Sequence, residues 1–194
     1  MEIDIIRYNL KEMLKNRGDD VSYIIEHGDA VEVHRYYNEL IILDTDRTTV
    51  FFALNKDVLK EWKQQDEDAE AMIAKYKTKD FILVLADTPS PVMLTYIAGK
   101  DKALQEQGGM LQMFYTKDLK YNPLEHTLVP KHTKLSEAES KDLLQLYLAK
   151  KVQLPMIHKT DIIARWLGLK HGDIVKITRY NETSGEYFYY RTCV

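Results

Sequence analysis

The chain has 194 residues, of which 45% are hydrophobic and 29% are charged, a composition that excludes a disordered polar chain. This length accommodates one domain of ordinary size or two small ones. No apolar run approaches the roughly 20 residues that span a bilayer, so no membrane segment is predicted. The net charge of −3 is unevenly divided: residues 1–127 hold 16 Lys/Arg and 23 Asp/Glu, whereas residues 128–194 hold 11 and 7. The acidic first part argues against a free-standing, non-specific DNA-binding protein.

The first predicted element is an amphipathic helix, because apolar residues recur at spacings of three and four from Ile3 to Leu14 and Gly18 is placed to end it. The apolar run at 81–86 predicts a central strand that is covered on both faces. Helices and strands intermixed around one buried strand predict an α/β or α+β layer domain. The remaining predicted strands are 21–25, 31–37, 40–43, 48–54, 92–97 and 110–116, with a helix at 57–77 and a short polar helix or loop at 99–109.

A domain boundary is predicted near 121–132, where two prolines and the change in charge balance occur. Beyond it, Ser136 followed three residues later by Glu139 predicts a capping box at the start of a helix. That helix has one apolar face, formed by Leu143, Leu144, Tyr147 and Leu148. An extended segment at 154–157, a short helix at 161–167 closed by Gly168, and a β-hairpin in 173–194 are predicted to follow. A unit of about 65 residues has a marginal core and usually gains stability from a partner.

The only pattern of a catalytic site is Glu61-Trp62-Lys63, whose Glu-x-Lys form occurs in metal-dependent nucleases. That chemistry needs the motif on a strand beside a second acidic residue. Here the motif falls within a predicted helix, so an ordinary helix surface is the favoured interpretation. The six histidines and the single cysteine lack metal-ligand spacing, and neither a nucleophile elbow nor a phosphate-binding glycine motif occurs. The sequence predicts no catalytic residue, no metal site and no cofactor.

The single cysteine, Cys193, cannot form an internal disulfide, and the N-terminal residues lack the basic segment of a secretory signal. We therefore expect a reducing, intracellular location. In that setting Asn181, which begins an Asn-Glu-Thr sequon, is a turn residue rather than a glycan acceptor.

The last predicted strand carries aromatic side chains on both faces, with Tyr187 and Tyr189 on one and Phe188 and Tyr190 on the other. A two-stranded ribbon cannot cover both faces by itself. Either the unit covers them with its own helices, or one face is an interface for another protein. Tyrosine and arginine are the residue types that anchor such interfaces, so the interface is favoured.

Four motifs in the C-terminal part carry a resemblance to a known family: "LVPKH", "QLPMI", "GLKHGDIVKI" and "ETSGEYFYYR". Their order and spacing resemble the assembly domain of the fifth-largest subunit shared by the eukaryotic nuclear RNA polymerases, a domain that also has an archaeal counterpart. The resemblance covers residues 128–194. Met156 departs from it, standing where the family usually has arginine. Earlier in the chain, "LKEMLKNRG" and "TPSPVM" resemble the opening helix and a DNA-proximal loop of the family's N-terminal jaw domain.

The resemblance implies a nuclease-like α/β jaw domain without nuclease activity at 1–126 and a small α+β assembly domain at 127–194. It implies a non-catalytic subunit of a multisubunit DNA-directed RNA polymerase that docks on the largest subunit, contacts other polymerase subunits and places the jaw near downstream duplex DNA, without sequence specificity. It involves no membrane, no cofactor and no small-molecule substrate. The expected location is the nucleus for a cellular protein, and the virion or a cytoplasmic viral factory for a virus-encoded one.

The residues expected to carry these roles form two groups. Those expected near DNA are Thr88, Pro89 and Ser90, which can touch phosphate through a hydroxyl or a backbone N–H. Those expected at the subunit interface are Lys170, Lys176, Arg179, Tyr187, Tyr189, Tyr190 and Arg191, which offer charge-assisted bonds and buried ring area. Two alternatives from other classes stay open: a metal-dependent nuclease built on the jaw fold, and a free adaptor that binds other proteins through the C-terminal part.

Overall fold

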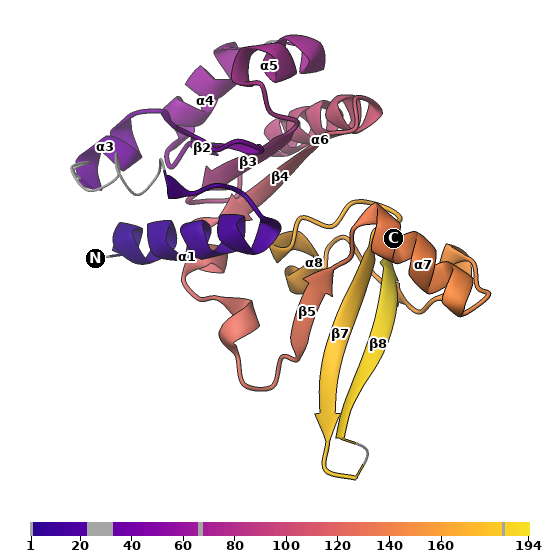
Figure 1. Ribbon diagram of the computed structural model, residues 1–194. Coiled ribbons are helices and arrows are strands. Elements are labelled where there is room, and N and C mark those ends of the chain that lie inside the picture. Colours follow the sequence, from indigo (N-terminus) through magenta and orange to yellow (C-terminus); the bar gives the residue numbers. More distant parts are fainter. Residues whose placement is uncertain (1, 23–32, 66–67, 184) are drawn as a thin grey trace. The chain divides into compact units, whose positions relative to one another are not determined.

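The computed structural model describes residues 2–22, 33–65, 68–183 and 185–194 and divides into two compact units, Met1–Tyr121 and Asn122–Val194. The sequence predicts a boundary between residues 126 and 127, and the compact units divide slightly earlier, after Tyr121. The mixture of helices and strands is confirmed in both units (Figure 1). Each unit has its own four-stranded sheet and is described separately.

The first unit is built around a sheet of order β1-β2-β3-β4, in which β1 and β2 form an antiparallel pair and β2, β3 and β4 run parallel. Parallel neighbours require crossover connections, and helices supply them here. The strands are β1 (Ile41–Asp44), β2 (Thr48–Phe52), β3 (Asp80–Leu85) and β4 (Met110–Tyr115). The helices are α1 (Glu2–Arg17), α3 (Val33–Asn38), α4 (Lys56–Gln64), α5 (Ala69–Tyr76) and α6 (Pro91–Glu106), with a 3₁₀ turn, η1 (Thr116–Leu119).

Both faces of this sheet are covered by helices, which explains the continuous apolar run of β3. One face, including Phe51, Phe81 and Leu83, packs against α4, α5 and α6 in a single buried cluster. Helix α1 lies on the opposite side of the sheet (Figure 1), where the Arg17 side chain donates a 2.6 Å hydrogen bond to Gln112 of β4. The central strand predicted at 81–86 is therefore confirmed. The opening helix is confirmed too: it ends at Arg17 and is followed by Gly18 with φ +86°.

Two strand predictions in this unit are wrong. Residues 92–97 lie in α6, because Ser90 caps the helix and Pro91 occupies its first turn. A six-residue apolar run does not distinguish a strand from a helix, and these start signals decide. The strand predicted at 31–37 overlaps helix α3 from Val33 onward. There Tyr36 packs edge-on against Phe52 with ring centroids 5.3 Å apart, a tertiary contact that overrides the strand preference of aromatic residues.

The helix predicted at 57–77 is interrupted, and α4 and α5 take its place. Asp68 caps α5 by accepting a 2.7 Å hydrogen bond from the backbone N–H of Ala71. A second helix therefore begins within the segment that the apolar periodicity predicts to be one continuous helix. The strand predicted at 21–25 lies outside the described residues beyond Ser22. The polar helix or loop expected at 99–109 is the continuation of α6 to Glu106.

Gly109 lies where the chain enters β4 against the backbone of Lys79, and a Cβ at this position would sit 2.2 Å from the Lys79 carbonyl oxygen. We expect Gly109→Ala to lower the free energy of unfolding by about 1–3 kcal/mol, because backbone rather than a flexible side chain must move. Gly99, inside α6 with open space around its Cβ position, is the matched control. Gly99→Ala should raise stability by about 0.5–1 kcal/mol. Urea denaturation measures both, and equal effects of the two changes would contradict the packing assigned to Gly109.

The second unit has a sheet of order β5-β7-β8-β6, in which β7 and β8 form the long antiparallel hairpin (Figure 1). The hairpin at the end of the chain is confirmed, as is the capping box, in which Glu139 accepts a 2.8 Å hydrogen bond from the N–H of Ser136. The strands are β5 (Lys131–Lys134), β6 (Met156–Ile157), β7 (Ile174–Asn181) and β8 (Gly185–Cys193). The helices are α7 (Glu137–Leu146) and α8 (Ile162–Trp166), with 3₁₀ turns η2 (Pro123–Glu125) and η3 (Lys151–Gln153).

The core of the second unit lies at the base of the hairpin, where Val175 and Cys193 pack with Ile163 and Ala164 of α8. The buried stretch of β7 ends at Ile177, and the residues from Arg179 to Asn181 are exposed. The unit therefore anchors one end of the hairpin and leaves the other end free of its own core.

Candidate functional site

The pairing register of the hairpin sorts its side chains onto two faces. Tyr189 lies opposite Ile177 and Tyr187 opposite Arg179, while Tyr190 lies opposite Lys176. Partners across an antiparallel pair share a face, and neighbours along a strand alternate. The first face carries Arg179, Tyr187, Tyr189 and Arg191, and is called the arginine face below; the second carries Lys176, Phe188 and Tyr190, and is called the lysine face.

On the arginine face, two guanidinium groups flank one ring. The Cζ atoms of Arg179 and Arg191 lie 5.4 and 5.6 Å from the ring centroid of Tyr189. A cation over an aromatic face is held by the ring quadrupole, at about 0.5–1 kcal/mol for an exposed pair. The contacts hold planar donors beside a half-buried ring, an arrangement typical of interface anchors.

On the lysine face, the Lys176 ammonium sits 3.6 Å from the centroid of the Phe188 ring, which is 47% exposed. Tyr190 meets Tyr147 at the end of α7, with ring centroids 6.0 Å apart in an edge-to-face arrangement. Burial raises the pKa of the Tyr190 hydroxyl above its ordinary value, and the neighbouring Tyr147 raises it further. The hydroxyl of Tyr190 therefore stays protonated at neutral pH and is available as a hydrogen-bond donor.

The lysine face continues into a run of exposed apolar side chains between the end of α7 and β6. Leu148 is 93% exposed, Val152 87% and Leu146 79%. The segment is tied to β8, because the Thr192 hydroxyl donates a 3.1 Å hydrogen bond to the Lys151 carbonyl. We call these residues the apolar strip: Leu146, Tyr147, Leu148, Val152 and Met156. Exposed apolar residues scattered singly need no explanation, but a contiguous set is typical of protein-interaction sites.

The apolar strip is the part of this surface that sequence reasoning missed. Periodicity assigns Leu143, Leu144, Tyr147 and Leu148 to one apolar helix face. Of these, Leu143 is buried, Leu144 is half-buried, and Tyr147 and Leu148 are exposed. Helix α7 ends at Leu146, and Leu148 has a left-handed backbone with φ 48°, so the chain turns away before the predicted face is complete. Leu146 was the residue that could have indicated an exposed apolar surface. It is as apolar as the residues of the predicted face but lies outside that face.

Six of the seven residues expected at the subunit interface lie on the hairpin. They are divided between its two faces. Lys170 lies apart, in the turn before β7, where its backbone N–H donates a 2.7 Å hydrogen bond to the Asp173 carboxylate. The hairpin and the apolar strip together make the candidate site of the second unit.

The residues expected near DNA lie in the first unit, in the connection from β3 to α6. The Ser90 hydroxyl accepts a 3.4 Å hydrogen bond from the N–H of Met93 and caps α6. Thr88 and Pro89 line a shallow pocket with Asn55 and Lys56, which open α4. Two helix N-termini thus meet at the carboxyl ends of β2 and β3, where partial positive charge favours an anion, although Asp87 also lines the pocket.

The Glu-x-Lys motif lies on α4 and not on a strand. The Lys63 ammonium group makes a cation–π contact with Tyr96, 5.0 Å from the ring centroid. Within the described ranges, no group of three or more His, Cys, Asp and Glu residues is arranged to hold a metal ion. No helix among the residues with assigned positions is long and apolar enough to cross a membrane.

His132 of β5 lies on the arginine face opposite Ile177, and its Nδ1–H donates a 2.6 Å hydrogen bond to the Pro130 carbonyl. Burial lowers the pKa of His132 below its ordinary value. The nearby Arg191 and Arg179 lower it too, while the Pro130 hydrogen bond and Asp161 oppose the shift. The folded protein therefore binds this proton less tightly than the unfolded chain does. It should lose stability as the pH falls below about 6.5, where unfolded histidine takes up a proton.

We expect His132→Gln to reduce the loss of unfolding free energy between pH 7.5 and pH 5.5, because the half-buried imidazole is replaced by a group that does not titrate. The same substitution at exposed His158 is the control and should leave the wild-type pH dependence in place. Urea denaturation at the two pH values measures this, and identical pH dependence of the wild type and His132→Gln would contradict it.

Comparison with known proteins assigns the second unit to a family. Residues 121–193 match the family model of the RNA polymerase Rpb5 C-terminal domain. The "DNA-directed RNA polymerases I, II, and III subunit rpabc1" of Dictyostelium discoideum is 44% identical over 90 residues, which are 46% of this chain and 46% of that protein. The subunit RPABC1 of Caenorhabditis elegans is 44% identical over 85 residues, 44% of this chain and 40% of that protein. The chain thus aligns with less than half the length of these relatives, and the resemblance to the polymerase subunit is confirmed.

Proposed function

We propose that this chain, whose residues 121–193 form an Rpb5 C-terminal domain, is a non-catalytic subunit of a multisubunit DNA-directed RNA polymerase. The observation that carries the proposal is the agreement between the matched region and the compact unit Asn122–Val194. A complete folded unit is related to the polymerase subunit, not a short motif within a different fold.

The second unit docks on the largest polymerase subunit. Its hairpin and apolar strip supply what a stable interface needs: a desolvated apolar centre with aromatic and arginine anchors and a charged rim. Tyr189 lies between Arg179 and Arg191, and the exposed Leu148 and Val152 provide apolar area that gains free energy only when a partner covers it. Contacts to other polymerase subunits extend from the same surface.

The jaw domain, residues 1–126, contains the first unit and lies near downstream duplex DNA. Its parallel β2-β3-β4 sheet with helices on both faces supports a nuclease-like α/β fold. The placement of Glu61 and Lys63 on α4 supports a jaw without nuclease chemistry. Because the relatives belong to polymerases I, II and III by name, a nuclear location follows for a cellular protein.

Contact with downstream DNA is made by Thr88, Pro89 and Ser90, through phosphate and without reading bases. We expect the double change Thr88→Glu and Ser90→Asp to weaken retention of duplex DNA by the assembled polymerase several-fold, because both add negative charge beside the backbone while Asp still caps α6. The matched control is Thr95→Glu, an exposed position further along α6. Gel-shift titration of purified polymerase measures the effect. Loss of the subunit from the complex would overturn the assignment of this loop.

Size-exclusion chromatography of the chain with and without the largest polymerase subunit tests the proposed function. We expect the two proteins to elute in a shared peak that contains one copy of each. Separate elution of the two proteins at micromolar concentration would overturn it, and would leave the chain as an adaptor for other partners.

A further inference from the structure

The outer edge of β8 is unpaired over most of its length. On this edge β8 pairs with β6, and that parallel pairing reaches only Thr192 and Cys193. Among the residues with assigned positions, no other strand pairs with this edge. The hairpin extends away from the helices of its unit (Figure 1), and its outer residues Tyr187 and Phe188 are exposed. Residues 185–191 therefore present an open strand edge.

Hydrogen bonds at the base of β8 identify the backbone groups that point to this edge. The N–H of Thr192 donates a 2.8 Å hydrogen bond to the carbonyl of Pro155. The N–H of Cys193 donates a 2.8 Å hydrogen bond to the carbonyl of Asp173, on the side of β7. Backbone groups alternate in direction along a strand, so every second residue before Thr192 also points outward. These outward-pointing residues are Glu186, Phe188 and Tyr190.

Pro155 prevents β6 from continuing along the open edge. In the pattern that begins at Thr192, the donor for the carbonyl of Tyr190 would be the N–H of residue 155, and proline has none. The residues before Pro155 instead form the 3₁₀ turn η3. The chain therefore ends its own pairing at Thr192 and leaves the edge beyond it open.

Two other edge strands are guarded against pairing with another chain. In β4 the N–H of Leu111 donates a 2.8 Å hydrogen bond to the carboxylate of Asp101, and the N–H of Tyr115 donates one of 3.3 Å to Asp118. Strand β5 has four residues, of which two are lysines. Short length and lysine both discourage edge pairing. Strand β8 has nine residues with four consecutive aromatics and neither lysine nor proline, so its edge is unguarded.

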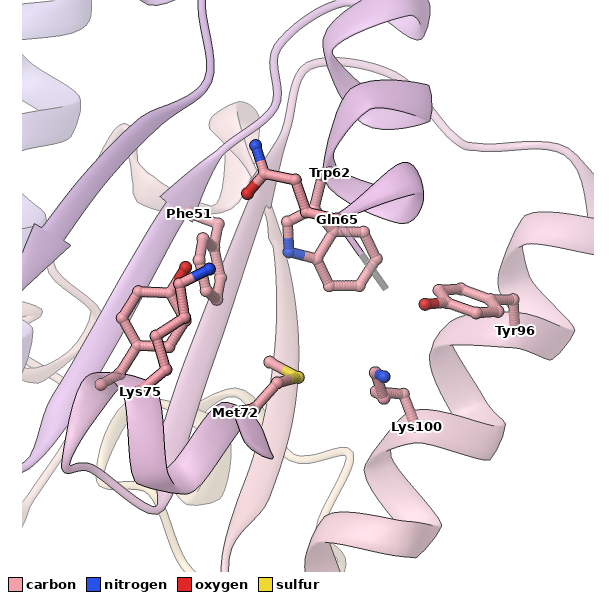
Figure 2. A pocket seen from close by; sticks show the side chains of 8 residues that line it. Phe51, Trp62, Gln65, Met72, Lys75, Tyr96 and Lys100 are labelled. Atoms are coloured by element: carbon pink, nitrogen blue, oxygen red, sulfur yellow. The ribbon is translucent and has the colours of Figure 1, made fainter. Parts of the chain in front are cut away.

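The hollow in the first unit does not offer a comparable docking surface. It lies between α4, α5 and α6, and Figure 2 shows Trp62 and Tyr96 among its lining residues. The two rings meet edge-on with centroids 6.0 Å apart, and Phe51 lies 6.1 Å from Trp62. These contacts fill the space that an inserted side chain would need, so we assign no ligand to the hollow.

Side chains beside the open edge define the chemistry of a strand that fits it. On the arginine face, the Nε of Arg191 is buried and has no hydrogen-bond partner among the described residues. A carboxylate of an added strand can form a charge-assisted hydrogen bond with this guanidinium group. On the lysine face, Phe188 and Tyr190 continue into the apolar strip, which favours apolar side chains. Because side chains alternate between faces, the strand that fits alternates acidic and apolar residues.

A second copy of this chain fits the edge less well. In an antiparallel pair of two β8 strands, the outward-pointing residues of one strand lie opposite those of the other. Glu186 is the one carboxylate of β8, and its side chain lies on the lysine face. Paired copies therefore keep this carboxylate on the lysine face and bring none to Arg191.

We infer that one extended segment of the largest polymerase subunit adds to β8 as a strand. It bonds to the backbone of Glu186, Phe188 and Tyr190, with carboxylates on the arginine face and apolar side chains on the lysine face. The inference rests on the proposed docking of the second unit and specifies its mode. Backbone hydrogen bonds supply affinity, and the alternating side chains supply specificity.

An amide-to-ester replacement tests the backbone contact without changing a side chain. Amber suppression with 4-hydroxyphenyllactic acid at Tyr190 of the full chain replaces the outward N–H by oxygen. The matched control is the same replacement at Tyr180 of β7, whose N–H points to the opposite edge of the hairpin beyond the end of β5. Surface plasmon resonance with immobilised largest subunit measures both. We expect about tenfold weaker affinity for the ester at Tyr190 and wild-type affinity for the ester at Tyr180.

Phe188→Pro and Phe188→Ala form a second matched pair. Both changes remove the ring, and only proline also removes the outward N–H. A proline is tolerated on an edge strand where its missing N–H makes no bond within the sheet. Circular dichroism identifies the folded variants. We expect Phe188→Pro to bind the largest subunit about tenfold more weakly than Phe188→Ala does.

Salt dependence tests the carboxylate on the arginine face. Raising the salt concentration should weaken binding of the wild type more than binding of Arg191→Gln, because salt screens the pair that Arg191 forms. Lys141→Gln, at an exposed position of α7, is the control and should keep the wild-type salt dependence. Equal salt dependence of the wild type and Arg191→Gln would remove the carboxylate from this face.

The outcomes separate strand addition from docking itself. Wild-type affinity of the ester at Tyr190, or equal affinities of folded Phe188→Pro and Phe188→Ala, would overturn strand addition while the proposed docking stands. Absence of binding by the wild type would overturn the proposed function and this inference with it. A dimer of the chain alone that the ester at Tyr190 dissociates, seen by analytical ultracentrifugation, would assign the edge to a second copy and would also overturn the inference.

Discussion

Tyr189→Ala should release the chain from assembled polymerase, with a loss of about 2–4 kcal/mol of binding free energy, the range of an interface anchor. The ring holds Arg179 on one side and Arg191 on the other, so its removal takes away aromatic area and leaves two guanidinium groups without their common support. Arg191→Ala should act in the same direction and somewhat less, because Arg179 and the ring remain. The measurement is subunit stoichiometry in purified polymerase, supported by the affinity for the largest subunit.

The control for this expectation is Tyr8→Ala, which removes a tyrosine of α1 that is 58% exposed in the first unit. It should leave stoichiometry unchanged. Circular dichroism of each variant separates a lost contact from a lost fold. A folded Tyr189→Ala protein that stays in the polymerase at full stoichiometry would show that the arginine face is not an anchor.

Polar replacement of the apolar strip should weaken assembly more than Tyr189→Ala does, and should leave folding almost unchanged. In the triple variant Leu146→Gln, Leu148→Asn and Val152→Gln, the replaced side chains are 79–93% exposed, so little apolar contact within the unit is lost. Asparagine also tolerates the left-handed backbone of residue 148 better than leucine does. Full burial of each of the three side chains by a partner stabilises the complex by about 1.5–3 kcal/mol. We therefore expect at least a hundredfold weaker affinity for the largest subunit.

A matched change at Leu128, which is 84% exposed in the same unit but outside the strip, controls for a general effect of lost hydrophobicity. Leu128→Gln should bind as the wild type does. Surface plasmon resonance with immobilised largest subunit measures both, and thermal melts establish that the triple variant is folded. Wild-type affinity of the folded triple variant would remove the strip from the interface.

Local signals in the sequence were sufficient wherever one short-range interaction decides the structure. The capping box of Ser136 and Glu139 and the hairpin with its turn near Asn181 are of this kind. The strand at 81–86 was readable because full burial of a central parallel strand leaves a continuous apolar run.

The errors arise where tertiary contact or a single cap decides between structures of similar propensity. The run at 92–97 is apolar enough for a strand, and the Ser90-Pro91 start makes it a helix. Residues from Val33 onward have strand-forming side chains, and they form α3, whose Tyr36 packs on Phe52. The sequence does not predict the exposure of the apolar strip either. Leucines at the end of a helix give the same apolar spacing whether the helix continues or stops.

We propose that the second unit docks through the hairpin and the apolar strip. Hydrogen exchange, measured by mass spectrometry on the full chain alone and within assembled polymerase, locates the surface that becomes covered. We expect amides in 146–156 and in the outer half of β8 to exchange more slowly after assembly, while exchange in α4 and α5 of the first unit stays unchanged. Unchanged exchange in 146–156 and β8, with slowing confined to the first unit, would contradict it.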